Sequence, residues 1–213
     1  MSGAAAPLTR LGALARRSTD ARERCELCGA PLAAEHRHLL DVAKRDLMCA
    51  CQACSVLFAS GAASAGHYRL VGDRRLRIDD LELDDVAWED LRLPVEMAFF
   101  FRNSELGRVQ AYYPSPMGPT ESLLGLEAWT ALEAANPVLR TLADDVEALL
   151  VNRVRGARRY WIVPISECYA LVGLIRTRWR GFTGGTEVWR EIGSFFEELD
   201  RRAKPASRTT GGS

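Results

Sequence analysis

Two Cys-x-x-Cys pairs are the residues of this chain whose types and spacing most clearly predict chemistry. Cys25 and Cys28 form the first pair, and Cys51 and Cys54 form the second. Each such turn presents two sulfurs, and four thiolates make a complete tetrahedral ligand set for zinc. We therefore predict a metal site made by these four cysteines, with zinc as the metal.

The residues between the two pairs must position them, and their pattern predicts a β-hairpin. Gly29 follows the first pair, where a positive φ angle is often needed. Residues 36–40 are expected to form one strand and residues 46–48 the returning strand. Residues 25–58 are then a zinc-ribbon-like or rubredoxin-like module. The rubredoxin-like alternative places one iron ion on the same four thiolates and makes the protein an electron carrier.

Three further residues of this segment could contact the metal. Cys49 lies two residues before the second pair, so it could replace Cys51 or lie beside the site as a fifth thiol. His36 and His38 are two residues apart, which places them on the same side of a strand. They could be ligands, could support the ligands from outside, or could simply form the polar face of the hairpin.

The rest of the chain predicts an α+β fold, in which a small antiparallel sheet packs with about four helices. Strands are expected within residues 67–114, ended by the prolines of 114–119, and over 159–164. Helices are expected over 120–135, from 137 through about 150, and after Ser166 and Thr186. The expected domains are a flexible arm (1–24), the cysteine module (25–58), the α+β domain (65–203) and a disordered tail (204–213).

Composition excludes some classes of function. Lysine plus arginine equals aspartate plus glutamate at 28 each among 213 residues, so overall charge does not direct the protein to nucleic acid or membrane. The longest apolar runs, such as residues 95–101, are too short to span a bilayer. The start of the chain lacks the continuous apolar core of a secretory signal. We therefore expect a cytoplasmic protein with reduced cysteines. No feature of the sequence identifies a small-molecule substrate.

Local charge and aromatic residues suggest surfaces for partners. Seven acidic residues lie within 79–90, and seven arginines lie within 153–180 together with Trp161 and Trp179. The arginines could form a nucleic-acid surface or could pair with the acidic segment. Candidate protein-docking residues are Tyr113, Pro114, Arg178, Trp179 and Trp189, although turns and packing explain them equally well.

No motif predicts catalysis directly. The chain has no P-loop, no dinucleotide-binding glycine motif, no serine elbow and no His-Glu-x-x-His. Cys168 begins a predicted helix but has no neighbouring histidine in the sequence. These observations favour a non-enzymatic protein without excluding an enzyme.

Several motifs together resemble a known family. They are CELCG, HRHLLD, CACQACSVLF, AYYPSPMGPTESLL, NPVLRTLADDVEALLVNR and CYALVGLIRTRWRGFTGGTEVWREIGSFF. They resemble a bacterial domain-of-unknown-function family encoded near actinobacterial-type nickel–iron hydrogenase genes. The resemblance covers residues 25–202 and implies an accessory role in the assembly, maturation or electron handling of a hydrogenase. It implies hydrogenase subunits as partners and assigns no catalytic residue.

Overall fold

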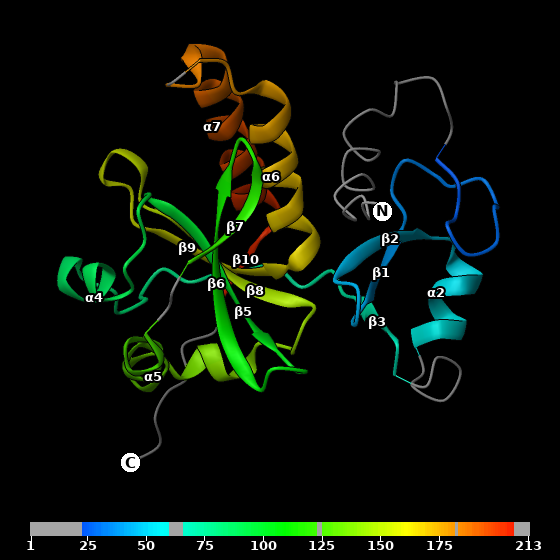
Figure 1. Ribbon diagram of the computed structural model, residues 1–213, viewed down its shortest axis with the longest axis horizontal. Coiled ribbons are helices and arrows are strands. Elements are labelled where there is room, and N and C mark those ends of the chain that lie inside the picture. The colour runs from blue at the N-terminus through cyan, green and yellow to red at the C-terminus, as the bar shows by residue number, and fades with distance from the viewer. Residues whose placement is uncertain (1–22, 60–65, 123–124, 182, 207–213) are drawn as a thin grey trace, which may run out of the picture.

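The computed structural model describes residues 23–59, 66–122, 125–181 and 183–206. It has an α+β fold with two sheets (Figure 1). A three-stranded sheet with a short helix forms a lobe near the N-terminal end, and a seven-stranded sheet covered by helices forms the larger part. Residues 1–22 of the expected arm and residues 207–213 of the expected tail lie outside the described residues. No helix in the described part of the chain is long and apolar enough to cross a membrane.

The smaller sheet is built around the predicted hairpin. Strands β1 (Arg37–Asp41) and β2 (Asp46–Ala50) pair antiparallel, and β3 (Tyr68–Val71) adds to the other edge of β1. Helix α2 (Gln52–Ala59) follows β2 directly and packs against β1 and β3. The hairpin prediction is confirmed. The third strand comes from beyond residue 58, so this lobe needs residues from both sides of the 60–65 segment.

The larger sheet is more extensive than the small sheet expected from the sequence. Its strand order is β10-β4-β9-β8-β5-β6-β7, and every pair is antiparallel except β10 with β4. The strands are β4 (Leu76–Arg77), β5 (Met97–Asn103), β6 (Arg108–Ser115), β7 (Gly118–Ser122), β8 (Glu147–Asn152), β9 (Arg159–Pro164) and β10 (Lys204–Pro205).

Helices cover both faces of this sheet. The described residues contain five α-helices, one in the smaller lobe and four with the larger sheet, as well as two short 3-10 helices. Besides α2 they are α4 (Asp85–Asp90), α5 (Leu126–Ala135), α6 (Ile165–Arg178) and α7 (Gly185–Arg202), with 3-10 turns at Pro137–Thr141 and Val154–Gly156. Helices α6 and α7 lie side by side on one face, and α4 and α5 lie toward the other (Figure 1).

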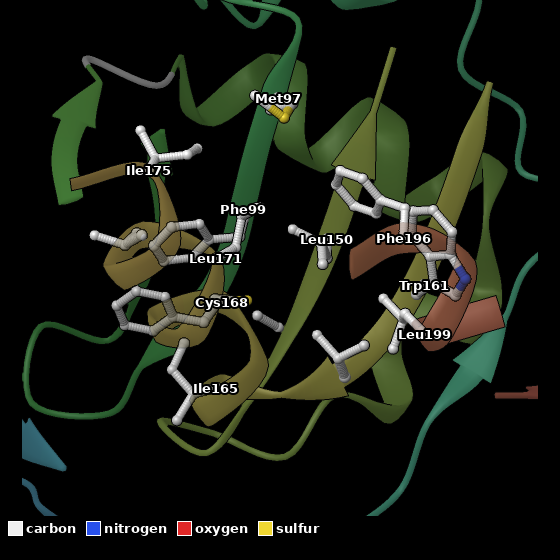
Figure 2. Packing of buried hydrophobic residues seen from close by; sticks show 14 of the residues in the cluster. Met97, Phe99, Leu150, Trp161, Ile165, Cys168, Leu171, Ile175, Phe196 and Leu199 are labelled. Atoms are coloured by element: carbon white, nitrogen blue, oxygen red, sulfur yellow. The ribbon is translucent and has the colours of Figure 1, made fainter. Parts of the chain in front are cut away.

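Strand alternation divides the core between the two faces. Phe99, Leu150 and Trp161 point toward α6 and α7, where Trp161 stacks on Phe196 with ring centroids 5.2 Å apart (Figure 2). The intervening residues, including Phe100 and Ile162, point toward α5 and the segment around α4. The central strands therefore carry apolar residues on both faces, which is why they form continuous hydrophobic runs in the sequence.

Two sequence predictions about this sheet are wrong. The helix expected from residue 137 ends at Thr141, and residues 147–152 form the fully buried strand β8. A short apolar run fits a buried strand as well as a helix, and periodicity alone does not separate them. The prolines do not end the sheet either, because Pro114 and Pro119 lie opposite one another in the β6–β7 hairpin. A proline is tolerated near the edge of a sheet at positions where no backbone N–H is needed as a hydrogen-bond donor.

The start of α7 requires glycine at one position. Gly184 has φ +82°, and a Cβ there would lie 2.8 Å from Val188 Cγ1 and 2.9 Å from a Trp179 ring carbon. We expect Gly184→Ala to lower the free energy of unfolding by about 1–3 kcal/mol, through backbone strain and overpacking. Chemical denaturation measures this.

Gly193 of the same helix is the matched control. It is exposed, and a Cβ there has no atom within 4 Å. Gly193→Ala should raise stability by about 0.5–1 kcal/mol because alanine is the better helix former. Equal effects of the two substitutions would contradict the described geometry at Gly184.

Candidate metal centre

The fold brings the four cysteines of the two Cys-x-x-Cys pairs together. The sulfur atoms of Cys25, Cys28, Cys51 and Cys54 all lie within 4.8 Å of one another. The sulfurs of Cys28 and Cys51 are 3.6 Å apart. Four sulfurs placed tetrahedrally about 2.3 Å from a zinc ion would be about 3.8 Å apart. The donor set and its spacing therefore fit one tetrahedral metal ion.

Backbone hydrogen bonds shape the two cysteine turns. The Gly29 N–H donates to the Cys25 carbonyl at 2.8 Å, with Gly29 at φ +73°, so the first pair sits in a tight turn. The second pair spans the end of β2 and the first turn of α2, where the Cys54 N–H donates to the Cys51 sulfur at 3.4 Å. These contacts fix the backbone of the two turns that carry the cysteines.

Glu26 joins the two turns. Its backbone N–H donates to the Cys49 carbonyl at 3.0 Å, and its carboxylate accepts from the Cys49 N–H at 2.8 Å. The first cysteine turn is therefore held against β2 by two hydrogen bonds in addition to any metal. No sequence pattern singled out Glu26, because its role depends on the pairing of segments 23 residues apart.

The four thiols do not ionise equally. Burial raises the pKa of Cys25, but hydrogen bonds from the backbone N–H groups of Cys51, Cys28 and Leu27 outweigh it and lower the pKa to about 6. Burial and the three neighbouring thiols raise the pKa of Cys54 to about 12. The Ala30 N–H lowers the pKa of Cys28, but Cys25 and Cys51 raise it by more. Cys25 therefore ionises more readily than Cys28 or Cys54, and a bound cation would favour the thiolate form of those two neighbours.

The other three candidate ligands form a second cluster. The donor atoms of His36, His38 and Cys49 also lie within 4.8 Å of one another. His38 lies directly opposite Cys49 in the β1–β2 register, so both side chains project from the same face of the sheet. The neighbouring residues Leu39 and Ala50 project from the other face, where they pack with Cys25 and Cys54. Cys49 is therefore separated from the four-cysteine cluster by the sheet.

The two histidines of this cluster are packed together. Their ring centroids are 4.8 Å apart. His36 Nδ1 lies 3.1 Å from the Ala33 carbonyl oxygen and 3.5 Å from a Glu23 carboxylate oxygen, whereas no described residue forms a hydrogen bond with its buried Nε2. Burial lowers the pKa of His38, and the neighbouring His36 lowers it further. A neutral imidazole is the form that binds a metal.

A model of the family of unknown function DUF5947 matches residues 24–203. This chain belongs to that family. The match begins next to Cys25 and ends at the C-terminal end of α7, so it includes both clusters and the whole larger sheet through β9. No curated protein and no solved structure matches the chain. Membership of this family assigns no activity to the cysteines. The geometry of the two clusters is therefore the basis for any functional proposal.

A cavity of about 1170 Å³ lies beside the second cluster. Residues 31–38 of the smaller lobe line one side, including His36 and His38, and α6 lines another through Glu167, Tyr169 and Arg176. Arg75 and Arg202 also line it, and both form ion pairs with Glu167. The cavity thus lies between the smaller lobe and the larger sheet. Sequence reasoning did not predict it.

The candidate docking residues are partly explained by packing. Trp179 and Trp189 meet edge to face with ring centroids 5.8 Å apart, and their indole N–H groups donate to the Gly181 and Thr183 carbonyls at 2.9 Å. Pro114 is buried and Tyr113 is half-buried in β6. Arg178 is exposed and pairs with Glu191 at 3.2 Å. Packing therefore accounts for both tryptophans and the proline.

Several of the arginines within 153–180 pair with carboxylates of this chain. Arg153 and Arg158 both bind Asp85, which belongs to the acidic segment, and Arg159 binds Asp200 at 3.0 Å. The interpretation that the two charged segments pair within the chain is thus supported. Cys168 is completely buried in the α6–α7 core, where burial raises its pKa well above the ordinary value. It is a core residue (Figure 2).

Proposed function

We propose that the protein binds one zinc ion through Cys25, Cys28, Cys51 and Cys54, and that this ion holds the smaller lobe together. The observation that supports the proposal most strongly is the convergence of four sulfurs within 4.8 Å. Four thiolates fill every position of tetrahedral zinc, so a substrate would find no open coordination position. Such a site is structural, and it stabilises a module that has little core of its own.

We further propose that the protein is a non-enzymatic accessory factor of a nickel–iron hydrogenase, acting through protein–protein contacts. The resemblance of the motifs to the hydrogenase-associated family supports a hydrogenase as the partner. A lobe organised by a metal, joined to a larger domain, is a suitable scaffold for docking. A cytoplasmic location, where nickel–iron enzymes are assembled, fits this role.

A rubredoxin-like electron carrier is the second candidate. The same four sulfurs fit one iron ion equally well, because sulfur distances are similar for the two metals. A nucleic-acid-binding regulator has weaker support, since Arg153, Arg158, Arg159 and Arg178 are already paired with carboxylates. Ion pairs of this kind reduce the positive charge available to phosphates.

Elemental analysis with a visible spectrum, on protein expressed in iron-replete native cells, decides the metal. We expect zinc and a colourless protein. A red protein with stoichiometric, redox-active iron would overturn the structural-zinc proposal in favour of electron transfer.

A separate experiment tests whether a hydrogenase is the partner. Affinity-tagged protein expressed in its native host should co-purify with hydrogenase subunits, and deletion of its gene should impair hydrogenase processing or activity. Unchanged processing and activity in the deletion strain would contradict the accessory role, whatever metal the protein binds.

A further inference from the structure

We propose that His36, His38 and Cys49 form a second metal site that binds one divalent transition-metal ion and leaves a coordination position open to the cavity. The site is distinct from the four-cysteine site and differs from it in chemistry. It offers two imidazole nitrogens and one sulfur, and their donor atoms lie within 4.8 Å of one another. Zinc bound tetrahedrally to these donors would place them about 3.3–3.7 Å apart, which small side-chain rotations achieve.

His36 shows the arrangement of a metal-binding histidine. Its Nδ1 faces the Ala33 carbonyl at 3.1 Å and the Glu23 carboxylate at 3.5 Å, and both are acceptors. Nδ1 therefore carries the proton, and Nε2 keeps its lone pair. The His36 side chain is only 8% exposed, and within the part of the chain that the structure describes its buried Nε2 has no hydrogen-bond partner. Buried polar atoms are rarely left unsatisfied, and a carboxylate behind the opposite nitrogen is typical of metal-bound histidine.

The backbone places the other two donors beside it. His38 and Cys49 are paired residues of β1 and β2, and adjacent strands hold paired side chains on one face about 5 Å apart. His36 precedes β1 by one residue, and its ring lies 4.8 Å from that of His38. Two antiparallel strands thus present three donors without any long flexible loop between them.

The position of the cluster separates it from the four-cysteine site. The sheet lies between them, since Leu39 and Ala50 pack with Cys25 and Cys54 on the opposite face. His36 and His38 line the cavity of about 1170 Å³, which gives a fourth ligand access to the ion. Three protein ligands with one open position characterise catalytic rather than structural zinc.

The charges around the site permit a dication. Glu23 lies beside His36, Glu167 lines the same cavity, and Cys49 would contribute a thiolate. Arg75 and Arg202 share the single carboxylate of Glu167, and Arg45 pairs with Asp145. Arg37 and Arg176 also line the cavity, so the negative charge for the ion comes from Glu23 and the Cys49 thiolate rather than from the cavity as a whole. Imidazole and thiolate donors favour zinc, cobalt and nickel over magnesium or calcium, which prefer oxygen.

Cobalt titration of the full chain tests the proposal. Reduced, metal-free protein should bind two Co²⁺ ions, and both should give sulfur-to-cobalt absorption because both sites contain cysteine. His36→Gln should bind one ion and keep the spectrum of the four-sulfur site. Cys28→Ser should lose that spectrum, and because the second cluster lies on the same small sheet, this variant should also weaken or lose the second ion. Loss of the second ion alone, in His36→Gln, therefore distinguishes the second site from the first.

His67→Gln is the matched control. His67 is the third histidine of the chain, is exposed, and lies outside the cluster, so this variant should still bind two ions. Binding of a single ion by the wild type, or of two ions by His36→Gln, would overturn the proposal. So would loss of the four-sulfur spectrum in Cys49→Ser, because Cys49 would then belong to the first site.

X-ray absorption spectroscopy of the wild-type protein saturated with zinc tests the proposal without variants, which could fail to fold. The proposal predicts nitrogen neighbours at about 2.0–2.1 Å in addition to sulfur at about 2.3 Å. Sulfur neighbours alone would contradict it.

Discussion

Cys25→Ser is expected to remove the metal of the four-cysteine site and to unfold the lobe formed by β1, β2, β3 and α2. Among the described residues, the buried core on that side of the small sheet is Cys25, Leu39, Ala50 and Cys54, and two of these four are proposed ligands. Structural zinc contributes roughly 10–16 kcal/mol to comparable modules, and so small a core cannot replace that amount. Amide hydrogen exchange should show loss of protection in residues 37–59 and 68–71.

The larger sheet should survive this substitution. Its core on the α5 face contains no residue from the small lobe, and its core on the α6–α7 face takes only Leu40 and Val71 as buried residues from it. Cys168→Ala is the control, because Cys168 is a buried cysteine outside both clusters. It should keep the metal and the protection of the small lobe. Retained protection in metal-free Cys25→Ser would show that the metal does not hold the lobe together.

Asp145→Asn is expected to lower the free energy of unfolding by about 3–5 kcal/mol, the usual result of removing one partner from a buried ion pair. The Asp145 side chain is fully buried, and its carboxylate accepts from Arg45 Nη1 at 2.7 Å and from Ser104 Oγ at 2.6 Å. Arg69 lies 3.3 Å away. Arg45 and Arg69 belong to the small lobe, whereas Asp145 precedes β8, so this carboxylate joins the two parts of the molecule.

Loss of that charge also leaves Arg45 poorly compensated. The Arg45 side chain is 23% exposed and its guanidinium lies 4.7 Å from the centre of the Phe101 ring, and Nη2 has no hydrogen-bond partner among the described residues. Asp79→Asn is the matched control, because Asp79 also pairs with an arginine but is 62% exposed. That variant should change stability by less than about 1 kcal/mol. Equal urea midpoints for the two variants would contradict a special role of Asp145.

The same carboxylate predicts a pH dependence. Burial raises the pKa of Asp145, but hydrogen bonds from the Ser104 hydroxyl and N–H and from Arg45 outweigh it, so the pKa is lowered overall. A lowered pKa in the folded state stabilises the protein above the unfolded value of about 3.9, and this contribution is lost as pH falls through the folded value. The stability difference between wild type and Asp145→Asn should therefore shrink below about pH 4. A difference that stays constant as the solution is acidified would contradict this assignment.

The sequence predicted the parts of the fold that depend on local spacing. The two cysteine pairs, the hairpin between them and the strand at 159–164 follow from patterns within a few residues of one another. Strand β8 was mistaken for a helix because buried central strands have no alternating polar residues. The continuation of β6 through Pro114 was not expected from the sequence. A proline is accepted there because it lies opposite Pro119 in the β6–β7 hairpin, and this pairing is visible only in the structure.

The second cluster and the cavity depend on contacts that local patterns do not encode. His36 and His38 were recognisable as a pair, but their proximity to Cys49 follows from the register of β1 with β2. Glu23 and the unpartnered His36 nitrogen, which distinguish a ligand from a surface histidine, become visible only when the segment before β1 is placed. The Arg45–Asp145 contact joins residues 100 positions apart. Sequence patterns that relate residues a few positions apart cannot predict such a contact.

Native mass spectrometry of wild type and Cys28→Ser tests the central proposal, a zinc ion held by the four cysteines, most directly. Cys28 is the exposed member of the four, so its replacement by serine removes a ligand without opening a cavity in the core. We expect the wild type to carry zinc and the variant to carry fewer zinc ions. A wild-type protein without bound metal, or a variant with the same number of zinc ions, would contradict the proposal.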